Sequence, residues 1–225
     1  MKIYLRLAPA LTLTLILTAF AAAQQAPVPV EDEPHHHVVL KNDSVIVMRV
    51  KVLPGESTEF HTHAHDRVAV ELSEATITQQ KPGEAEGATE VRKPGDVLAS
   101  TANGPYTHRV HDVGSTAFEV LDVELLQRPT TASGPAAGKV EAENPSARVY
   151  KWTLEPGATA AMHSHDHPYL IIAATPMMVK MTGPDGKSMG HEVAAGDFHW
   201  IDAGVTHSLT NDGTTAGQIV EIELK

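Results

Sequence analysis

Six histidines stand in a pattern that suits metal ions. They form two H-x-H pairs, each followed farther along the chain by a third histidine: His61, His63 and His108, then His163, His165 and His207. The 225-residue chain has no cysteine, so a transition-metal site can draw only on imidazole and carboxylate ligands. These ligands suit iron, manganese, nickel, copper and zinc, and the pattern predicts two sites for a divalent metal of this group.

The histidines lie among short segments in which apolar and polar residues alternate. On an extended strand, side chains at positions i and i+2 point to the same face, so both members of an H-x-H pair can face one ion. Alternation with a period of two predicts strands, and turn pairs such as Pro54-Gly55 and Pro94-Gly95 separate them. No amphipathic helical pattern follows residue 23, so the sequence predicts an all-β fold, either a sandwich or a barrel.

The two sets of histidines belong to two copies of one segment. Residues 41–65 align without a gap on residues 143–167, which places each H-x-H pair on the other. Later stretches correspond as well: KPGD around Gly95 with AAGD around Gly196, and DVEL at 122–125 with EIEL at 221–224. An internal repeat of this length indicates a tandem duplication of one structural unit.

The histidine pattern resembles the two motifs of the cupin superfamily. The first motif is G-x5-H-x-H-x3,4-E, and Gly55 and Gly157 precede the two H-x-H pairs at that spacing. The second motif is G-x5-P-x-G-x2-H-x3-N. The C-terminal half follows this motif from Gly196 to Asn211, with Asp202 at the position where proline is usual. The N-terminal half is looser: it retains Gly95, His108 and Asp112 and has an extra residue in the loop.

Because both motifs occur twice and cover nearly all of the chain after residue 23, the chain is similar to a bicupin. The resemblance implies two tandem jelly-roll barrels, also described as double-stranded β-helices, with a metal pocket in each. The implied metal ligands are the six histidines of the two sets.

Both halves depart from the first motif at its glutamate. Three residues past the second histidine of each pair stand Arg67 and Tyr169, so each site is expected to hold its metal with three histidines. His65 or His167 is a candidate for the fourth ligand. Cupins with three-His centres resemble thiol dioxygenases and diketone-cleaving dioxygenases, which implies iron as the first expectation and an open coordination position for substrate and oxygen.

Arg67 and Tyr169 are the predicted catalytic residues. A cation at position 67 either weakens metal binding by repulsion, or binds an anionic group of the substrate, or forms a salt bridge with Glu71 or Asp66. Tyr169 is a hydrogen-bond donor, a weak ligand or a core aromatic. The cluster 35–37, three consecutive histidines, is interpreted as a solvated N-terminal stretch.

The amino end predicts export. Lys2 and Arg6 precede an apolar run over 7–20 and three small residues, the pattern of a secretory signal peptide cleaved after Ala23. The predicted organisation is therefore a signal peptide at 1–23, an N-terminal cupin domain at 24–126, a linker at 127–141 and a C-terminal cupin domain at 142–225. The expected location is periplasmic or secreted.

Charge narrows the classes of partner. The chain carries 17 Lys and Arg residues against 28 Asp and Glu residues, a formal net charge of −11, which opposes a nucleic-acid partner. No segment after the signal peptide has the length of a membrane span, so no membrane partner is expected, and assembly into oligomers stays open. Two function classes remain. One is a metal-dependent oxidoreductase of dioxygenase type acting on a small molecule, and the other is a non-catalytic cupin that binds a metal or small ligand for storage, scavenging or sensing.

Overall fold

The structure, a computed structural model, describes residues 26–128 and 138–225. The predicted signal peptide and most of the predicted linker lie outside these residues. Within them, no helix is long and apolar enough for a membrane span. The described chain is built from strands, apart from one 3-10 turn at Val30–Asp32, so the all-β prediction is confirmed.

The N-terminal half contains ten strands in two sheets. One sheet has the order β1-β4-β9-β6-β7 and the other the order β2-β3-β10-β5-β8. The bounds are β1 Val28–Pro29, β2 His36–Lys41, β3 Val45–Val52, β4 His61–His63, β5 Asp66–Glu71, β6 Ala75–Gln80, β7 Glu90–Arg92, β8 Val97–Ser100, β9 Tyr106–Asp112 and β10 Phe118–Leu125.

The C-terminal half repeats this arrangement with nine strands. Its sheets have the orders β11-β12-β19-β14-β17 and β13-β18-β15-β16. The bounds are β11 Val140–Glu143, β12 Ala147–Leu154, β13 Thr159–His165, β14 Tyr169–Ala173, β15 Met177–Thr182, β16 Ser188–Val193, β17 Phe198–Ile201, β18 Val205–Asn211 and β19 Gly217–Leu224. The first of these strands begins two residues before the predicted start of the C-terminal domain.

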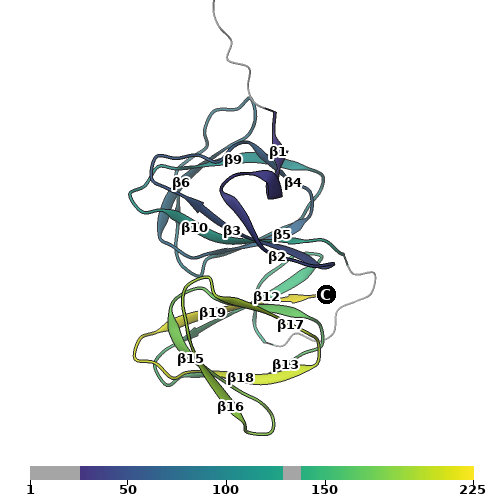
Figure 1. The fold of residues 1–225 in the computed structure, drawn as a ribbon, viewed down its shortest axis with the longest axis vertical. Helices are drawn as coiled ribbons and strands as arrows, with labels where there is room; N and C mark the ends of the chain where they lie inside the picture. The colour runs from purple at the N-terminus through teal and green to yellow at the C-terminus, as the bar shows by residue number, and fades with distance from the viewer. Residues whose placement is uncertain (1–25, 129–137) are drawn as a thin grey trace, which may run out of the picture.

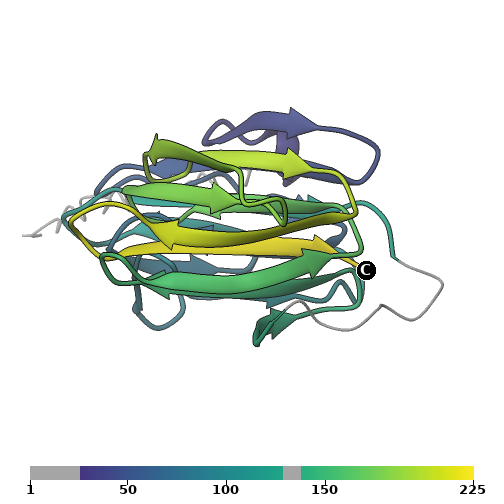
Figure 2. The same cartoon turned by 90° about the horizontal axis from the view of Figure 1, so that it is seen from below.

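Each half is a barrel of two facing sheets, and the barrels lie one above the other in Figure 1. Figure 2 views the pair from the side of the C-terminal half, with the strands of both halves aligned along nearly the same axis. Strand alternation gives each long strand two apolar faces. On β10, Val120 faces the interior of the N-terminal barrel, whereas Leu121 faces the other barrel.

The two barrels share one hydrophobic core. Fifteen buried residues from both halves form a single cluster, among them Val47 and Leu121 of the N-terminal barrel and Leu170 and Ile222 of the C-terminal barrel. Separate clusters fill the barrel interiors. Separation of the barrels would expose the shared core to water, at about 25 cal/mol for each Å² of apolar surface, so the two halves should form one stable unit.

Reciprocal contacts at the edge of this core follow from the duplication. Arg49 Nη2 donates to the carbonyl of Gly196 at 2.7 Å, and Lys151 Nζ, at the corresponding position of the second copy, donates to the carbonyl of Gly95 at 3.1 Å. Both glycines have φ of +81°, and a Cβ at Gly196 would lie 2.4 Å from Arg49 Nη2. Each barrel thus offers the carbonyl of its Gly-Asp turn to a basic side chain of the other barrel.

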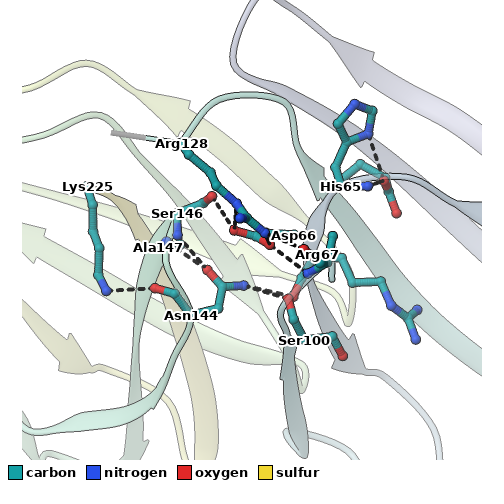
Figure 3. Close-up of polar contacts among 11 residues, drawn as sticks. His65, Asp66, Arg67, Ser100, Arg128, Asn144, Ser146, Ala147 and Lys225 are labelled. Carbon is teal, nitrogen blue, oxygen red and sulfur yellow. Dashed lines mark hydrogen bonds and ion pairs between the residues drawn. The ribbon is translucent and has the colours of Figure 1, made fainter. Parts of the chain in front are cut away.

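A buried carboxylate, Asp66, makes a further contact between the halves (Figure 3). It accepts hydrogen bonds from Arg128 Nε at 2.9 Å, Ser146 Oγ at 2.7 Å and the Ala102 amide at 2.7 Å. Beside it, Asn144 Nδ2 donates to the carbonyls of Arg67 and Ser100. These bonds fix the start of β5 and the end of β8 against the second barrel. Burial raises the pKa of Asp66, but the bonds from Arg128 and Ser146 outweigh it and lower the pKa.

We expect Asp66→Ala to lower the free energy of unfolding by about 2 kcal/mol at pH 7, because the Ser146 hydroxyl and the Ala102 amide lose a charged acceptor. Since the folded-state pKa of Asp66 is depressed, this contribution is complete at neutral pH and is lost as the pH falls through the folded-state pKa. Urea titrations at several pH values measure both effects. Arg128→Ala is the control, with a smaller loss because its side chain is about half exposed. Equal stability of the Asp66 variant and the wild type at pH 7 would contradict this role.

Candidate metal centres

Strand register brings each histidine pair opposite its third member. In the C-terminal barrel β13 pairs with β18 so that His163 lies across from His207. In the N-terminal barrel β4 pairs with β9 so that His61 lies across from His108. The second histidine of each pair, two residues on, projects to the same face. Two antiparallel strands therefore gather three imidazoles in each barrel.

The two imidazole trios have nearly the same geometry. In the C-terminal barrel the ring centroids lie 4.5 to 5.5 Å apart, and in the N-terminal barrel they lie 4.6 to 5.1 Å apart. All six rings are buried. The structure thus brings together every histidine that the sequence proposes as a metal ligand, three in each barrel.

In the C-terminal barrel a carboxylate joins the three rings. Glu221, on β19, is fully buried, and its Oε2 lies 3.2 Å from His163 Nε2 and 3.6 Å from His165 Nε2. Its Oε1 lies 3.2 Å from His207 Nε2. One donor atom from each of the four residues falls within 4.8 Å of the others. The cluster is therefore three histidines and one glutamate.

The three histidines expected in the C-terminal half meet there, and a carboxylate that the sequence pattern did not predict joins them. The motif glutamate is absent, since Tyr169 occupies its position, but a glutamate from the last strand approaches the rings instead. The sequence contained a signal: Glu221 and Glu223 alternate with apolar residues on a strand whose two faces are both buried. Acidic side chains on such a strand must project into the barrel.

Neighbouring side chains orient the ligands of this cluster. Trp152 Nε1 donates to Glu221 Oε2 at 2.6 Å, so this tryptophan has a polar role beside its packing. His163 Nδ1 donates to the Ala161 carbonyl at 2.8 Å, which leaves Nε2 facing Glu221. Glu223 Oε1 lies 3.3 Å from His165 Nδ1, and its other oxygen accepts from Tyr150. Such outer contacts hold ligating imidazoles in the orientation that a metal requires.

The C-terminal cluster fits a divalent transition metal. Nε2 of His165 and Oε1 of Glu221, which lie on the side where the four residues meet, are buried without a hydrogen bond of good geometry among the described residues. Buried polar atoms nearly always have partners, so these two atoms indicate a missing one. Three neutral imidazoles and a carboxylate are borderline and hard ligands that suit iron, manganese, nickel or zinc. A cation at their centre would satisfy the donor atoms that face inward.

In the metal-free cluster, protonated imidazole supplies the positive charge beside Glu221. Burial lowers the pKa of His165, but the carboxylates of Glu221 and Glu223 outweigh it and raise the pKa to about 9. Burial likewise raises the pKa of Glu221, and the close contacts of its carboxylate with the three imidazoles lower it well below its usual range. The cluster thus pairs a carboxylate with protonated imidazole, and metal binding must release protons.

The N-terminal trio differs because no carboxylate lies among its ring nitrogens. Asp122 occupies the register position of Glu221, but its Oδ2 lies 3.4 Å from Arg67 Nη1 and 3.7 Å from His63 Nδ1. His63 Nδ1 donates instead to Glu124 Oε1 at 2.7 Å, while its Nε2 lies 3.1 Å from His108 Nε2. This half matches the expected three-His arrangement.

His36 is a fourth imidazole of the N-terminal barrel. Its ring centroid lies 4.5 Å from that of His61, and the side chain is buried, so the interpretation of residues 35–37 as a solvated stretch is wrong for this residue. The reason is that β2 pairs with β3 and turns His36 inward. Glu33, also buried, accepts from His36 Nδ1 at 2.5 Å. Burial raises the pKa of Glu33, but the bonds from His36 and His35 lower it to about 2.

Two imidazoles of the N-terminal trio, His61 and His108, are neutral. Burial and the neighbouring rings of His36 and His63 lower the pKa of His61 to about 3, and burial lowers the pKa of His108 as well. Neutral imidazole is the form that binds metal, so neither of these two rings has to lose a proton. A metal here would, however, lie near the positive charge of Arg67. It would also lack the negative charge that Glu221 supplies in the other barrel.

Arg67 lies at the mouth of the N-terminal barrel. It lines a cavity of about 400 Å³ together with His63, His65 and Tyr106. Its ion pair is with Asp122 on β10, at 3.4 Å, and not with Asp66, which Arg128 occupies. Its predicted partner Glu71 pairs at 3.9 Å with Arg92. The guanidinium therefore borders both the cavity and the trio.

Tyr169 lies inside the C-terminal cluster. Its ring stacks on His165 with centroids 3.9 Å apart, and its hydroxyl lies 3.5 Å from His207 Nε2. Burial and the charges of Glu221 and Glu223 raise its pKa, so the phenol keeps its proton. It is placed as a hydrogen-bond donor beside the ligands.

The two histidines considered as fourth ligands lie outside the ligand groups. His65 Nδ1 bonds Glu124 Oε2 at 3.0 Å, and its side chain is 41% exposed. His167 is half-buried. Among the described residues, neither belongs to a group whose donor atoms could share one ion, and Glu221 takes the fourth position in the C-terminal barrel.

Comparisons with known proteins agree with this architecture. No protein-family model matches the chain. Over 90 residues, 40% of this chain, it is 29% identical to the beta-alanine degradation protein BauB of Pseudomonas aeruginosa, of which the match covers 94%.

Three solved structures resemble most of the chain. AerE from Microcystis aeruginosa has a TM-score of 0.59 at 14% identity, over 88% of this chain and 98% of that one. A cupin 2 conserved barrel domain protein from Leptotrichia buccalis has a TM-score of 0.52 at 14% identity, over 84% and 88%. A variant of oxalate decarboxylase OxdC from Bacillus subtilis has a TM-score of 0.50 at 15% identity, over 81% and 69%.

At such low identity these likenesses establish the fold. The chain has the fold of the bicupins: two jelly-roll barrels in tandem, with candidate metal ligands gathered in both. Which metal the protein holds, and for what purpose, does not follow from the fold.

Proposed function

We propose that this protein is an exported, metal-dependent oxidoreductase of dioxygenase type that acts on a small organic molecule in its C-terminal barrel. The observation that carries the proposal is the convergence of three imidazoles and the Glu221 carboxylate within 4.8 Å of one another, inside a barrel. Export to the periplasm or the medium rests on the N-terminal sequence alone.

The residues of the C-terminal barrel have distinct roles in this proposal. His163, His165, His207 and Glu221 hold the metal, with iron as the first expectation and manganese, nickel, copper or zinc as alternatives. A bound divalent metal supplies Lewis acidity and, in the case of iron, redox chemistry with oxygen.

The surrounding residues position the substrate and hold protons. Tyr169 keeps its phenolic proton and lies 3.5 Å from His207 Nε2, so it can donate a hydrogen bond to an oxygen of a substrate that reaches the cluster. Trp152 holds Glu221 in place through its indole N–H. The apolar residues around these groups exclude water, which strengthens each polar contact inside the site.

The N-terminal barrel favours the second function class, non-catalytic binding. Its trio has no carboxylate among the ring nitrogens, and the guanidinium of Arg67 lies beside it. The positive charge of Arg67 attracts an anionic group of a small ligand and repels a metal cation. The N-terminal barrel should therefore bind metal less tightly than the C-terminal barrel. We propose that this barrel binds a small anion at Arg67, in the cavity that this residue lines. BauB, which is similar to part of this chain, is named for degradation of beta-alanine, a small amino acid with a carboxylate.

Elemental analysis of the purified mature protein tests the proposal, with two matched triple variants. We expect His163→Ala/His165→Ala/His207→Ala to lose the bound metal, and His61→Ala/His63→Ala/His108→Ala to retain it. An iron-loaded wild-type protein should consume oxygen with at least one member of a panel of small organic compounds. Undiminished metal in the C-terminal variant contradicts the site, and a metal-loaded protein inert to the whole panel supports the binding function.

A further inference from the structure

A cavity of about 590 Å³ opens in the C-terminal barrel beside the candidate metal ligands. It lies between strands β14 and β17 on one side and the β15–β16 hairpin on the other, and this hairpin is on the side of the barrel away from the N-terminal half (Figure 1). The volume is in the range of small-molecule sites, about 300 to 1,000 Å³. Its walls are mainly aliphatic and thioether side chains, including Ile171, Met181 and Leu209.

The N-terminal barrel provides an internal control for this cavity. The corresponding space there measures about 50 Å³. Glu71 and Arg92 project into it from two strands and lie 3.9 Å apart, and Gln79 lines it as well. Polar side chains therefore fill in one copy the space that is open in the other.

Strand register identifies the residues responsible. Glu71 lies opposite Val120 on β10 as Ala173 lies opposite Ile219 on β19, and Arg92 pairs with Ala75 as Val193 pairs with Met177. Burial raises the pKa of Glu71 to about 8, so this carboxyl and the Arg92 guanidinium form a polar contact that alanine and valine replace in the C-terminal barrel. Met181 likewise stands at the position of Gln79. Loss of three large or polar side chains empties the cavity and makes its walls apolar.

The inner end of the cavity adjoins the metal ligands. Leu209 and Ile219 line it, and they stand two residues from His207 and Glu221 on the same strands. Residues i and i+2 of a strand share a face and lie about 6 to 7 Å apart, so cavity and cluster are successive layers of one barrel interior. Leu209 and Ile219 therefore form the wall between the cavity and the cluster.

The charged groups on the rim are already paired. Lys187 Nζ lies 2.8 Å from Asp185 Oδ2 and its side chain is 88% exposed, while Asp197 Oδ2 accepts from the Ala194 amide at 2.8 Å. The other ionisable side chains of the lining are His191 and His199, and most of the remaining wall is apolar. An apolar wall of this kind favours a neutral molecule over a charged one.

We propose that the C-terminal barrel binds a neutral, largely apolar organic molecule in this cavity, with Leu209 and Ile219 between it and the candidate metal ligands. The cavity is its binding site, and the β15–β16 hairpin forms the outer wall. The binding site stands on the cavity itself, whereas the statement that this molecule is the substrate rests on the proposed function. The two copies have therefore diverged: one takes an apolar molecule, and in the other the side chains of Glu71 and Arg92 fill the same space.

Calorimetric titration of the metal-free protein with 1-naphthol tests this binding, with 1-naphthoate as the matched anion. We expect one molecule of 1-naphthol to bind in each chain, at least tenfold more tightly than 1-naphthoate. Ala173→Glu/Val193→Arg, which installs the N-terminal pair, should weaken 1-naphthol binding at least tenfold. Met181→Gln, a milder change that also copies the other barrel, should weaken it several-fold and serves if the double variant does not fold.

A variant outside the cavity provides the control. Met162→Gln changes an exposed methionine on β13 and should bind 1-naphthol as the wild type does. Equal or tighter binding of 1-naphthoate, or unchanged 1-naphthol binding in both cavity variants, would overturn the proposal. So would a dimer in sedimentation that excludes 1-naphthol until Met189→Lys disrupts it, because a second copy would then occupy the cavity. Since no metal is present, loss of 1-naphthol binding and failure of the metal site are separate results.

Discussion

Glu221→Gln is expected to abolish metal retention in the C-terminal barrel, whereas Glu223→Gln on the same strand should only weaken it. Glu221 lies within 3.6 Å of all three imidazoles, so its charge is directed at the position of the ion. Glu223 contacts only the Nδ1 side of His165 and acts through that ring. Loss of an outer contact of this kind costs about 10- to 100-fold in metal affinity, and loss of the ligand itself should exceed this range.

Competition titration with a chromophoric chelator measures both affinities on purified protein. Gln keeps the volume of Glu and can still accept from Trp152, so circular dichroism should show the wild-type fold in both variants. Asp122→Asn, at the same register position of the N-terminal barrel, is the matched control and should leave the affinity of the C-terminal site unchanged. If Glu221→Gln and Glu223→Gln lower the affinity equally, Glu221 is not a ligand.

The histidine trios were predictable because short sequence patterns determine where most of their rings point. An H-x-H pair on a strand of period two fixes the face of both rings, and duplication shows that the pairs are parts of a repeated unit. The third histidine is remote in sequence, but its place in both copies identifies it. Strand register then needs only to bring His163 opposite His207, and His61 opposite His108.

The residues that sequence reasoning missed depend on which strands become neighbours. Glu221 reaches the trio because β19 lies between β12 and β14, an arrangement that no short-range pattern specifies. His36 enters the N-terminal barrel because β2 pairs with β3 beyond a tight turn. Arg67 pairs with Asp122 rather than a residue near it in sequence, since β5 and β10 are adjacent in the sheet.

The two copies differ mainly in where their charged side chains lie. In the C-terminal barrel a carboxylate lies among the imidazoles, and the walls of the nearby cavity are mainly apolar. In the N-terminal barrel the corresponding carboxylate, Asp122, pairs with a guanidinium, and the side chains of Glu71 and Arg92 fill the interior. The C-terminal barrel therefore favours a cation and a neutral molecule. The N-terminal barrel, with the same fold, favours an anion at its mouth.

Leu121→Ala, on the N-terminal side of the shared core, is expected to destabilise the C-terminal barrel as well as its own. Leu121 is fully buried in the cluster to which both halves contribute. Truncation of such a leucine costs about 2 to 5 kcal/mol. Both tryptophans, Trp152 and Trp200, belong to the C-terminal half, and Trp200 packs against this cluster. Tryptophan fluorescence therefore reports on the barrel that the substitution does not belong to.

The measurement is thermal unfolding followed by tryptophan fluorescence and by far-ultraviolet circular dichroism. In a cooperative unit both signals shift together to lower temperature, by about 2 to 4 °C for each kcal/mol lost. Ile77→Ala, a buried change inside the N-terminal barrel and away from the shared core, distinguishes long-range cooperativity from local contact. If the barrels unfold as one, it too shifts the fluorescence transition. A fluorescence transition unmoved by Ile77→Ala, with circular dichroism in two steps, would mean that the barrels unfold independently and that the shared core only joins them.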